Sequence, residues 1–233
     1  MVQKSKKMAR VALALQARIS SKRLPNKIFH ELEPGFTVLD SCLKQCHSIK
    51  SFLKYNTDIY LLIPQEQKQI FEHVSENWAV PLVLGPEDNV LRRFENLYEL
   101  KKYDYMVRLT ADCPVLPPLV AKAVIEETIE KKYDYGCTKT PEDWFDGSDV
   151  ECFTASILTK LSEYARKHKY KVTEKGYNTI EHVTWPIKND PDFFSIKLYF
   201  PRDERFKDVP KLSVDNAEDL FRVIQLRKSL WWM

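Results

Sequence analysis

Short apolar runs alternate with helical patterns along the first part of the chain, and this alternation strongly limits the folds that it can adopt. The runs have the length and composition of buried strands, and they cover residues 10–16, 58–63, 79–84 and 105–109. Between them, apolar residues recur every three or four positions, as in amphipathic helices. Strands separated by helices of about 10–15 residues form βαβ units, whose right-handed crossovers place the strands parallel. The pattern predicts an α/β fold with a mostly parallel mixed sheet flanked by helices.

The helices expected in this part cover residues 38–53, 65–78, 87–101 and 118–131, and Pro81 favours an edge position for the strand 79–84. The rhythm changes after residue 138. Further along we expect an extended segment at 133–138, a turn-rich loop at 139–149, strands at 150–154, 193–200 and 212–214, helices at 156–168 and 216–230, and an exposed basic segment at 167–175. The sequence therefore predicts one Rossmann-like domain over residues 9–230, with a small inserted lobe at about 139–200 and a basic N-terminal extension at 1–8.

The chain has only five glycines among its 233 residues, at positions 35, 85, 136, 147 and 176. A glycine content of about 7% is usual. With this spacing neither G-x-G-x-x-G nor G-x-x-x-x-G-K-[ST] can occur. The chain therefore lacks the glycine fingerprints of the usual NAD enzymes, protein kinases and P-loop NTPases. A nucleotide bound by this chain requires a different loop.

Charge and cysteine content favour a cytoplasmic protein that binds neither nucleic acid nor membrane. The formal net charge is +3, and the isoelectric point of 8.4 lies below the value of about 9 that suggests a nucleic-acid binder. No apolar run approaches the roughly 18 residues of a membrane-spanning helix, and the stretch after the basic N-terminus is too short for a secretory signal. The five cysteines are odd in number. Cys42 and Cys46, four apart on a predicted helix, have no second pair at zinc spacing and are interpreted as buried structural thiols rather than a metal or redox pair.

The loop after the first predicted strand is rich in groups that bind phosphate. Ligands of open α/β sheets bind beyond the carboxyl ends of the strands. The loop, ARISSKRLPNK at 17–27, carries four cations and two hydroxyls. Cations offset the charge of a polyphosphate, while hydroxyl and backbone N–H donors orient it. A solvated basic loop is the alternative, but the position directly after a buried strand favours phosphate binding.

Two aspartates, Asp112 and Asp215, each follow an expected strand and are the candidate metal ligands. Carboxylates at the ends of two strands can converge across a sheet, and Mg²⁺ is typically held by one or two carboxylates together with phosphates and water. Each residue also has a structural alternative. Asp112 precedes Cys113-Pro114 and can be a turn residue, and Asp215 with Glu218 fits a helix capping box.

Six segments in order resemble the successive motifs of one enzyme family. They are QARISSKRLPNK at 16–27, LGPEDNVLRRF at 84–94, VRLTADCPVL at 107–116, FDGSDVECF at 145–153, EHVT at 181–184 and LSVDNAEDL at 212–220. The family is the cytidylyltransferases of the spore-coat polysaccharide (SpsF-like) type, related to the acylneuraminate and 3-deoxy-octulosonate cytidylyltransferases. The resemblance covers about residues 9–228. It implies a Rossmann-like (GT-A-like) nucleotide-diphospho-sugar transferase fold and transfer of CMP from CTP to an acidic sugar for surface polysaccharide synthesis, with release of pyrophosphate.

The resemblance also implies roles for individual residues. The triphosphate loop corresponds to Arg18, Ser21, Arg23 and Lys27, of which Arg18 and Lys27 are expected to be catalytic together with the metal ligands Asp112 and Asp215. The cytidine pocket corresponds to Gly85, Asp88 and Arg92. Positions near the acceptor, in or beside the inserted lobe, correspond to Asp146, Gly147, Asp149, Glu151, Glu181 and His182. The resemblance further implies Mg²⁺ as cofactor, CTP and an acidic small molecule as ligands, and a homodimer.

The chain departs from the family pattern at three positions. Ser20 and Asn26 stand where glycine is usual, which predicts a less close backbone approach to the phosphates. Ile180 stands where an arginine usually precedes the Glu-His pair. The alternatives to an acid-sugar cytidylyltransferase are a cytidylyltransferase with a phosphonate acceptor, a glycosyltransferase on the same fold, and a non-catalytic nucleotide-binding protein. His182 can also be a structural histidine, and the Trp231-Trp232 tail can cover either a partner or the chain's own core.

Overall fold

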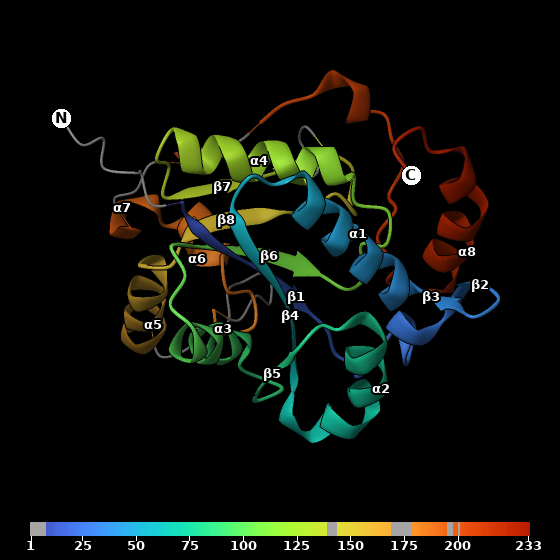
Figure 1. Ribbon diagram of the computed structural model, residues 1–233, viewed down its shortest axis with the longest axis horizontal. Helices are drawn as coiled ribbons and strands as arrows, with labels where there is room; N and C mark the ends of the chain where they lie inside the picture. The colour runs from blue at the N-terminus through green and yellow to red at the C-terminus, as the bar shows by residue number, and fades with distance from the viewer. Residues whose placement is uncertain (1–7, 139–143, 169–178, 195–197, 200) are drawn as a thin grey trace.

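A seven-stranded sheet in the order β5-β4-β1-β6-β8-β7-β9 forms the centre of the computed structural model, which describes residues 8–138, 144–168, 179–194, 198–199 and 201–233 (Figure 1). Strands β5, β4, β1 and β6 are parallel, β8 is antiparallel to both β6 and β7, and β9 is parallel to β7. The predicted mostly parallel mixed sheet is confirmed. The strands are β1 Arg10–Gln16, β4 Asn56–Pro64, β5 Leu82–Gly85, β6 Tyr105–Thr110, β7 Tyr135–Cys137, β8 Glu151–Thr154 and β9 Leu198–Tyr199.

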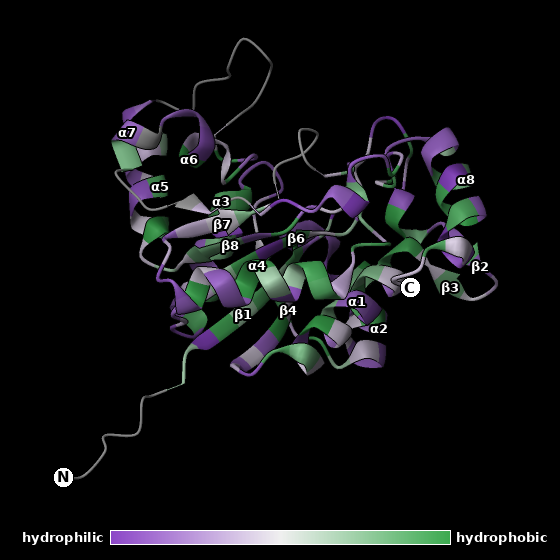
Figure 2. Cartoon of the chain, turned by 90° about the horizontal axis from the view of Figure 1, so that it is seen from above, coloured by the Kyte–Doolittle hydropathy of each residue, from purple (hydrophilic) through white to green (hydrophobic). Residues whose placement is uncertain are grey.

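Helices cover both faces of this sheet. The helices are α1 Val38–Phe52, α2 Lys68–Trp78, α3 Val90–Leu100, α4 Pro118–Glu130, α5 Ile157–Lys167, α6 Trp185–Asn189, α7 Pro191–Phe194 and α8 Ala217–Leu226. Green and purple residues alternate along α1, α4 and α8 in Figure 2, as expected for amphipathic helices. A capping box starts α1, because the Thr37 side chain accepts from Asp40 N and the Asp40 carboxylate accepts from Thr37 N. A short hairpin of β2 Glu31–Glu33 and β3 Phe36–Thr37 precedes α1 and was not expected from the sequence.

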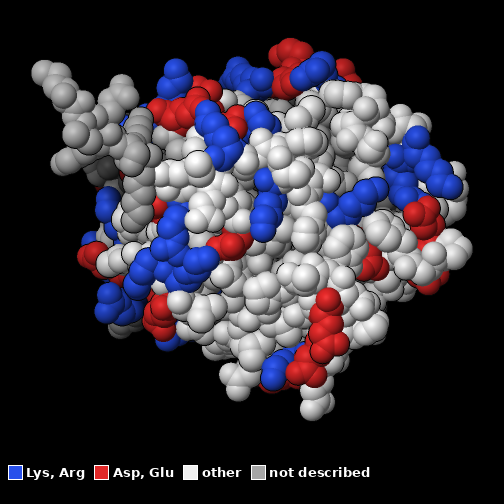
Figure 3. Space-filling model, viewed as in Figure 1, with Lys and Arg blue, Asp and Glu red and all other residues white. Residues whose placement is uncertain are grey.

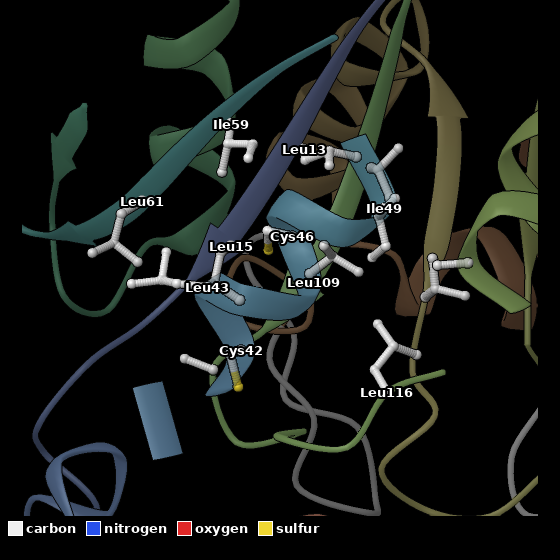
Figure 4. Packing of buried hydrophobic residues seen from close by; sticks show 14 of the residues in the cluster. Leu13, Leu15, Cys42, Leu43, Cys46, Ile49, Ile59, Leu61, Leu109 and Leu116 are labelled. Atoms are coloured by element: carbon white, nitrogen blue, oxygen red, sulfur yellow. The ribbon is translucent and has the colours of Figure 1, made fainter. Parts of the chain in front are cut away.

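The alternation of large and small side chains along β1 separates two hydrophobic clusters. Leu13 and Leu15 face one cluster with residues of α1, α2 and α4, which Figure 4 shows around Cys42, Cys46 and Ile49. Ala12 and Ala14 face the other cluster, with residues of α3 and α5. Successive strand residues point to opposite faces of a sheet, so a strand buried on both faces reads as a continuous apolar run.

Cys42 and Cys46 lie inside the first cluster, 4% and 1% exposed. Neither forms a disulfide, and burial raises the pKa of the Cys46 thiol to about 12. The interpretation as buried structural thiols is confirmed.

One predicted strand is shorter in the described chain, and another is absent from it. Residues 191–194 form helix α7, and within 193–200 only Leu198–Tyr199 is a strand. Residues 212–214 belong to no sheet, because their N–H groups donate to the carbonyls of Asp146 and Asp112 in loops rather than to a strand. The terminal helix is also shorter than predicted, since α8 ends at Leu226 and a 3₁₀ turn, Arg227–Ser229, follows.

The region predicted as an inserted lobe contributes β8 and β9 to the main sheet. The N-terminal extension at 1–7 and most of the segment 167–175 lie outside the described residues. On the face drawn in Figure 3, basic and acidic residues are interspersed. No helix among the described residues is long and apolar enough to span a membrane.

Candidate functional site

A polar cavity of about 850 Å³ lies beyond the carboxyl ends of the parallel strands. Its walls come from the loop after β1, the loop between β5 and α3, the end of β6, and residues 181–182. The lining residues are Gln16, Ala17, Arg18, Ser20, Ser21, Lys22, Arg23, Lys27, Ile28, Glu87, Val90, Arg93, Arg108, Thr110, Ala111, Asp112, Glu181, His182 and Asp215. This is where an open α/β sheet binds its ligand. All four residues predicted for the triphosphate loop line the cavity.

The loop after β1 is held in shape by its own backbone. The N–H groups of Ser21 and Asn26 both donate to the carbonyl of Ile19, at 2.8 and 3.2 Å. Asn26 has φ 54° and ψ 26°, in the left-handed region, and it begins the 3₁₀ turn Lys27–Phe29. Asparagine tolerates this conformation better than most residues. The turn then carries Lys27 into the cavity.

Lys27 joins the two predicted metal-binding aspartates. Its Nζ lies 2.7 Å from Asp112 Oδ2 and 3.1 Å from Asp215 Oδ1, and only 13% of its side chain is exposed. Burial acts to lower the pKa of Lys27, but Asp112 and Asp215 together raise it above its ordinary value. Arg23 and Lys211 also bind Asp215, at 2.7 and 2.9 Å. Two carboxylates that share one ammonium are close enough to share one cation.

The pair of carboxylates fits a divalent cation that completes its shell with phosphates and water. Mg²⁺ prefers oxygen ligands and is usually bound through one or two carboxylates and substrate phosphates rather than by a protein cage. Consistent with this, no group of three or more His, Cys, Asp or Glu side chains that could hold a metal occurs among the described residues.

Hydrogen bonds between segments far apart in the sequence hold Asp215 close to Asp112. Val214 N donates to Asp112 O at 2.8 Å, and the N–H groups of Leu212 and Ser213 donate to Asp146 O. Gly147 permits this approach, because its φ is +119° and a Cβ there would lie 2.6 Å from Ser213 N. The predicted capping box does not form, and the N-cap lies one residue further along the chain. The N-cap of α8 is Asn216, whose side chain accepts from Asp219 N. Asp215 therefore precedes the cap, and its carboxylate binds cations.

Glu181 and His182 line the cavity opposite the loop after β1. Glu181 Oε1 accepts from Arg18 Nη2 at 2.7 Å. Burial, with Arg108 and Arg18 nearby, lowers the pKa of His182, although Glu181 opposes the shift. His182 is therefore poised as a neutral ring near neutral pH.

Three predicted acceptor residues, Asp146, Asp149 and Glu151, do not line the cavity. Asp146 is exposed and uses its carbonyl to hold residues 212–213. Glu151 is 4% exposed and accepts four bonds, from Arg108, Thr184, Tyr135 and Lys188. Although burial acts to raise the pKa of Glu151, Lys188 and Arg108 lower it well below its usual range. The structure thus places Glu151 behind the cavity wall.

Asp149 provides a prediction on stability. Burial, reinforced by Glu151 and Asp146, raises its pKa to about 6. Because the folded state holds this proton more tightly than the unfolded state, the stabilising contribution is complete below about pH 4 and is lost as the pH rises through about 6. Asp149→Asn, which stays neutral, is expected to remove this decline and to be more stable than wild type at pH 7 by on the order of 1–3 kcal/mol. The free energy of unfolding is measured by urea denaturation at pH 4 and pH 7 in the presence of EDTA. Exposed Asp208→Asn is the control. Parallel declines in wild type and Asp149→Asn would contradict the assignment.

Two residues predicted for the cytidine pocket, Asp88 and Arg92, do not line the cavity, but a neighbour of each does. Asp88 is exposed and does not line the cavity, whereas Glu87 does. Arg92 pairs with Glu95 and Glu99 on the outer side of α3, at 3.2 and 3.1 Å. Arg93 lines the cavity instead and was missed from the sequence.

Arg93 is an unusual buried cation. It is 1% exposed and donates to the carbonyls of Leu62 and Glu87, while its Nε has no hydrogen-bond partner among the residues that the structure describes. Burial and the nearby Arg18 lower its pKa to about 10. Gly85 makes room for it, since a Cβ there would lie 2.7 Å from Arg93 Cγ. Gly85, which was predicted for the cytidine pocket, therefore contributes to the site indirectly, by leaving space for the Arg93 side chain.

The chain is similar to known proteins in sequence and in fold. The chain is 26% identical over 214 residues to the spore coat polysaccharide biosynthesis protein SpsF of Bacillus subtilis, covering 90% of this chain and 82% of that protein. Its fold matches a cytidylyltransferase from Leptospira borgpetersenii with a TM-score of 0.75, 21% identity and coverage of 94% and 95% of the two chains. It also matches a CMP:2-keto-3-deoxy-manno-octonic acid synthetase solved with CTP, with a TM-score of 0.64, 11% identity and coverage of 95% and 99%. The family model of the cytidylyltransferases matches residues 12–231, and this chain therefore belongs to the cytidylyltransferase family.

Proposed function

We propose that the protein transfers CMP from CTP to the hydroxyl of an acidic sugar of the ulosonic or nonulosonic type and releases pyrophosphate, as a homodimer that uses Mg²⁺. The observation that carries the proposal is the meeting of the cations of the loop after β1 with Asp112 and Asp215 in one cavity. The SpsF relative and the CTP-bound synthetase support a sugar acid as acceptor.

In the proposed reaction the acceptor oxygen attacks the α-phosphorus of CTP in line. A bond forms between the acceptor oxygen and the α-phosphorus, the bond from the α-phosphorus to the oxygen that bridges to the β-phosphate breaks, and pyrophosphate leaves. The proton of the acceptor hydroxyl passes to solvent. Positioning and charge stabilisation provide most of the catalysis in such reactions. Arg18, Arg23 and Lys27 neutralise the charge that builds up on the leaving pyrophosphate. Asp112 and Asp215 would hold the metal, which supplies positive charge to the phosphate and the attacking oxygen when bound.

Nucleotide choice and product formation test this proposal. CTP with Mg²⁺ is expected to raise the melting temperature more than ATP, GTP or UTP, because a ligand at ~100 Kd stabilises by about 2.7 kcal/mol. Pyrophosphate release from CTP is then measured with N-acetylneuraminate, 3-deoxy-manno-octulosonate and other sugar acids. Equal shifts from all four nucleotides, or release with none of the acids, would contradict the proposal.

A further inference from the structure

Arg108 is a cation of the cavity that, like Arg93, lies outside the loop after β1. It lies on β6, two positions before Thr110 at the end of the strand, and Asp112 follows in the turn after β6; all three residues line the cavity. Side chains at alternate positions of a strand share one face. At about 3.3 Å per residue, the Cα of Arg108 is roughly 7 Å behind that of Thr110 along the strand. Arg108 therefore lies deeper on the β6 side of the cavity than the candidate metal ligand Asp112.

The guanidinium of Arg108 is held in place on two sides. Its Nε donates to Gln16 Oε1 at 2.9 Å, and its Nη1 donates to Glu151 Oε2 at 2.7 Å. Glu151 lies directly opposite on the antiparallel strand β8 and is itself fixed by Tyr135, Thr184 and Lys188. A cation whose orientation is already set by the protein binds an anion with little loss of side-chain entropy.

Arg108 also retains unused donors. Arginine has five N–H groups in a planar fork, and only those on Nε and Nη1 have partners within the described part of the chain. Of the other cavity cations, Arg18 binds Glu181, and Arg23 and Lys27 bind Asp215. Arg93 donates to two backbone carbonyls, and Lys22 lies exposed on the loop after β1. The planar fork suits a carboxylate, which accepts two parallel N–H bonds.

The neighbours of Arg108 favour an anion of the acceptor over a phosphate of the nucleotide. The loop after β1 follows the strand next to β6, and Glu87 and Arg93 lie beyond it on the β5 side. Ile180, where the family pattern has an arginine, is instead partly buried against the cluster of α3 and α5. Its carbonyl accepts from Leu91 N at 3.0 Å. An acid group of an acceptor bound on the β6 side would meet Arg108, which lines that side.

We propose that Arg108 is the specificity-determining residue that binds the carboxylate of the acceptor, with Glu151 and Gln16 as its positioning residues. This inference rests on the proposed function and adds the group that selects an acid over a neutral sugar. Arg108 forms no covalent bond and moves no proton in this role.

Two variants separate carboxylate binding from folding. Arg108→Lys keeps the charge against Glu151 but loses the planar fork. The double variant Arg108→Gln with Glu151→Gln removes the charges of this pair together. The amide oxygen at position 151 can still accept from Lys188, whose side chain is 36% exposed. Exposed Arg166→Gln on α5 is the matched control. For each protein, KM is measured for CTP and for the sugar acid that gives pyrophosphate release, and the same sugar is tested as its carboxamide.

Both variants are expected to raise KM for the acid by about 10- to 100-fold, the worth of a hydrogen bond to a charged group, with KM for CTP unchanged. The preference for the acid over the carboxamide is expected to disappear. An unchanged KM for the acid in the variants, while wild type turns over, would overturn this inference alone. A rise in KM for CTP instead would assign Arg108 to the nucleotide and overturn it as well. Absence of release from wild type with every acid would overturn the proposed function together with this inference.

Discussion

Lys27→Met is expected to lower the rate of pyrophosphate release by about 10²–10³-fold, the loss typical of removing one donor that stabilises transition-state charge. Lys27 is the most buried of the cations on the loop after β1 that form ion pairs, and its ammonium lies between Asp112 and Asp215. In the free protein it neutralises these carboxylates, and in the proposed reaction it faces the leaving pyrophosphate. Single-turnover measurement at saturating CTP reports the chemical step directly.

The same substitution is expected to destabilise the protein in the absence of divalent cations. Without the ammonium, Asp112 and Asp215 repel each other, and on the order of 1–3 kcal/mol is lost. Mg²⁺ is expected to raise the melting temperature of Lys27→Met more than that of wild type, because the ion can then bind both carboxylates without competing with lysine. Exposed Lys131→Met is the control. A full rate in Lys27→Met would remove Lys27 from the site, and an equal Mg²⁺ response in both proteins would contradict the shared carboxylate pair.

The central part of the fold was predictable because its signals are local. The run at 10–16 is apolar at consecutive positions, which is typical of a strand buried on both faces, and β1 lies inside the sheet. Pro81 favoured an edge strand, and β5 is at the end of the sheet order. The loop after β1 was recognisable for the same reason, since its cations follow the strand without interruption.

Two of the differences at the site are shifts of one residue. Arg92 and Arg93 are adjacent, but neighbours on a helix point about 100° apart. One therefore pairs with glutamates on the outer side, and the other lies buried in the cavity wall. The cap of α8 is likewise Asn216 rather than Asp215. A sequence motif locates such a segment, but only the packing of the helix decides which residue faces the ligand.

Contacts between distant segments account for the remaining differences. Residues 212–214 have the composition of a strand, yet they bond to Asp112 and Asp146 in loops. Glu151 belongs to a motif that resembles the family pattern, but its carboxylate already accepts hydrogen bonds from four donors on β6, β7 and the α6 region. One local signal for Arg108 was present: an arginine within a buried strand requires a partner, because an unpaired buried charge is costly.

Asp215 and Asp112 provide the other large expected effect, through a substitution that changes charge and little else. Asp215→Asn and Asp112→Asn each replace a hard anionic oxygen by an amide of the same shape, and each is expected to lower turnover by about 10²–10³-fold at limiting Mg²⁺. Helix α8 keeps its cap in Asp215→Asn, because that cap is Asn216. Added Mg²⁺ is expected to restore part of the rate in both variants, whereas exposed Asp208→Asn is expected to behave as wild type.

The stability of Asp215→Asn separates the metal role from a purely structural one. Burial acts to raise the pKa of Asp215, but Lys211 and Lys27 lower it below its ordinary value. The charged form therefore stabilises the fold above the unfolded pKa of about 3.9, and this contribution is lost as the pH falls through the folded pKa. Asp215→Asn is expected to be modestly less stable than wild type at pH 7, with the difference closing toward acid pH. In Asp215→Asn, Lys211 still pairs with Asp219, and Lys27 still pairs with Asp112. We therefore expect this variant to remain folded while its turnover is largely lost. Near-wild-type turnover of either variant at limiting Mg²⁺ would remove that aspartate from the metal site.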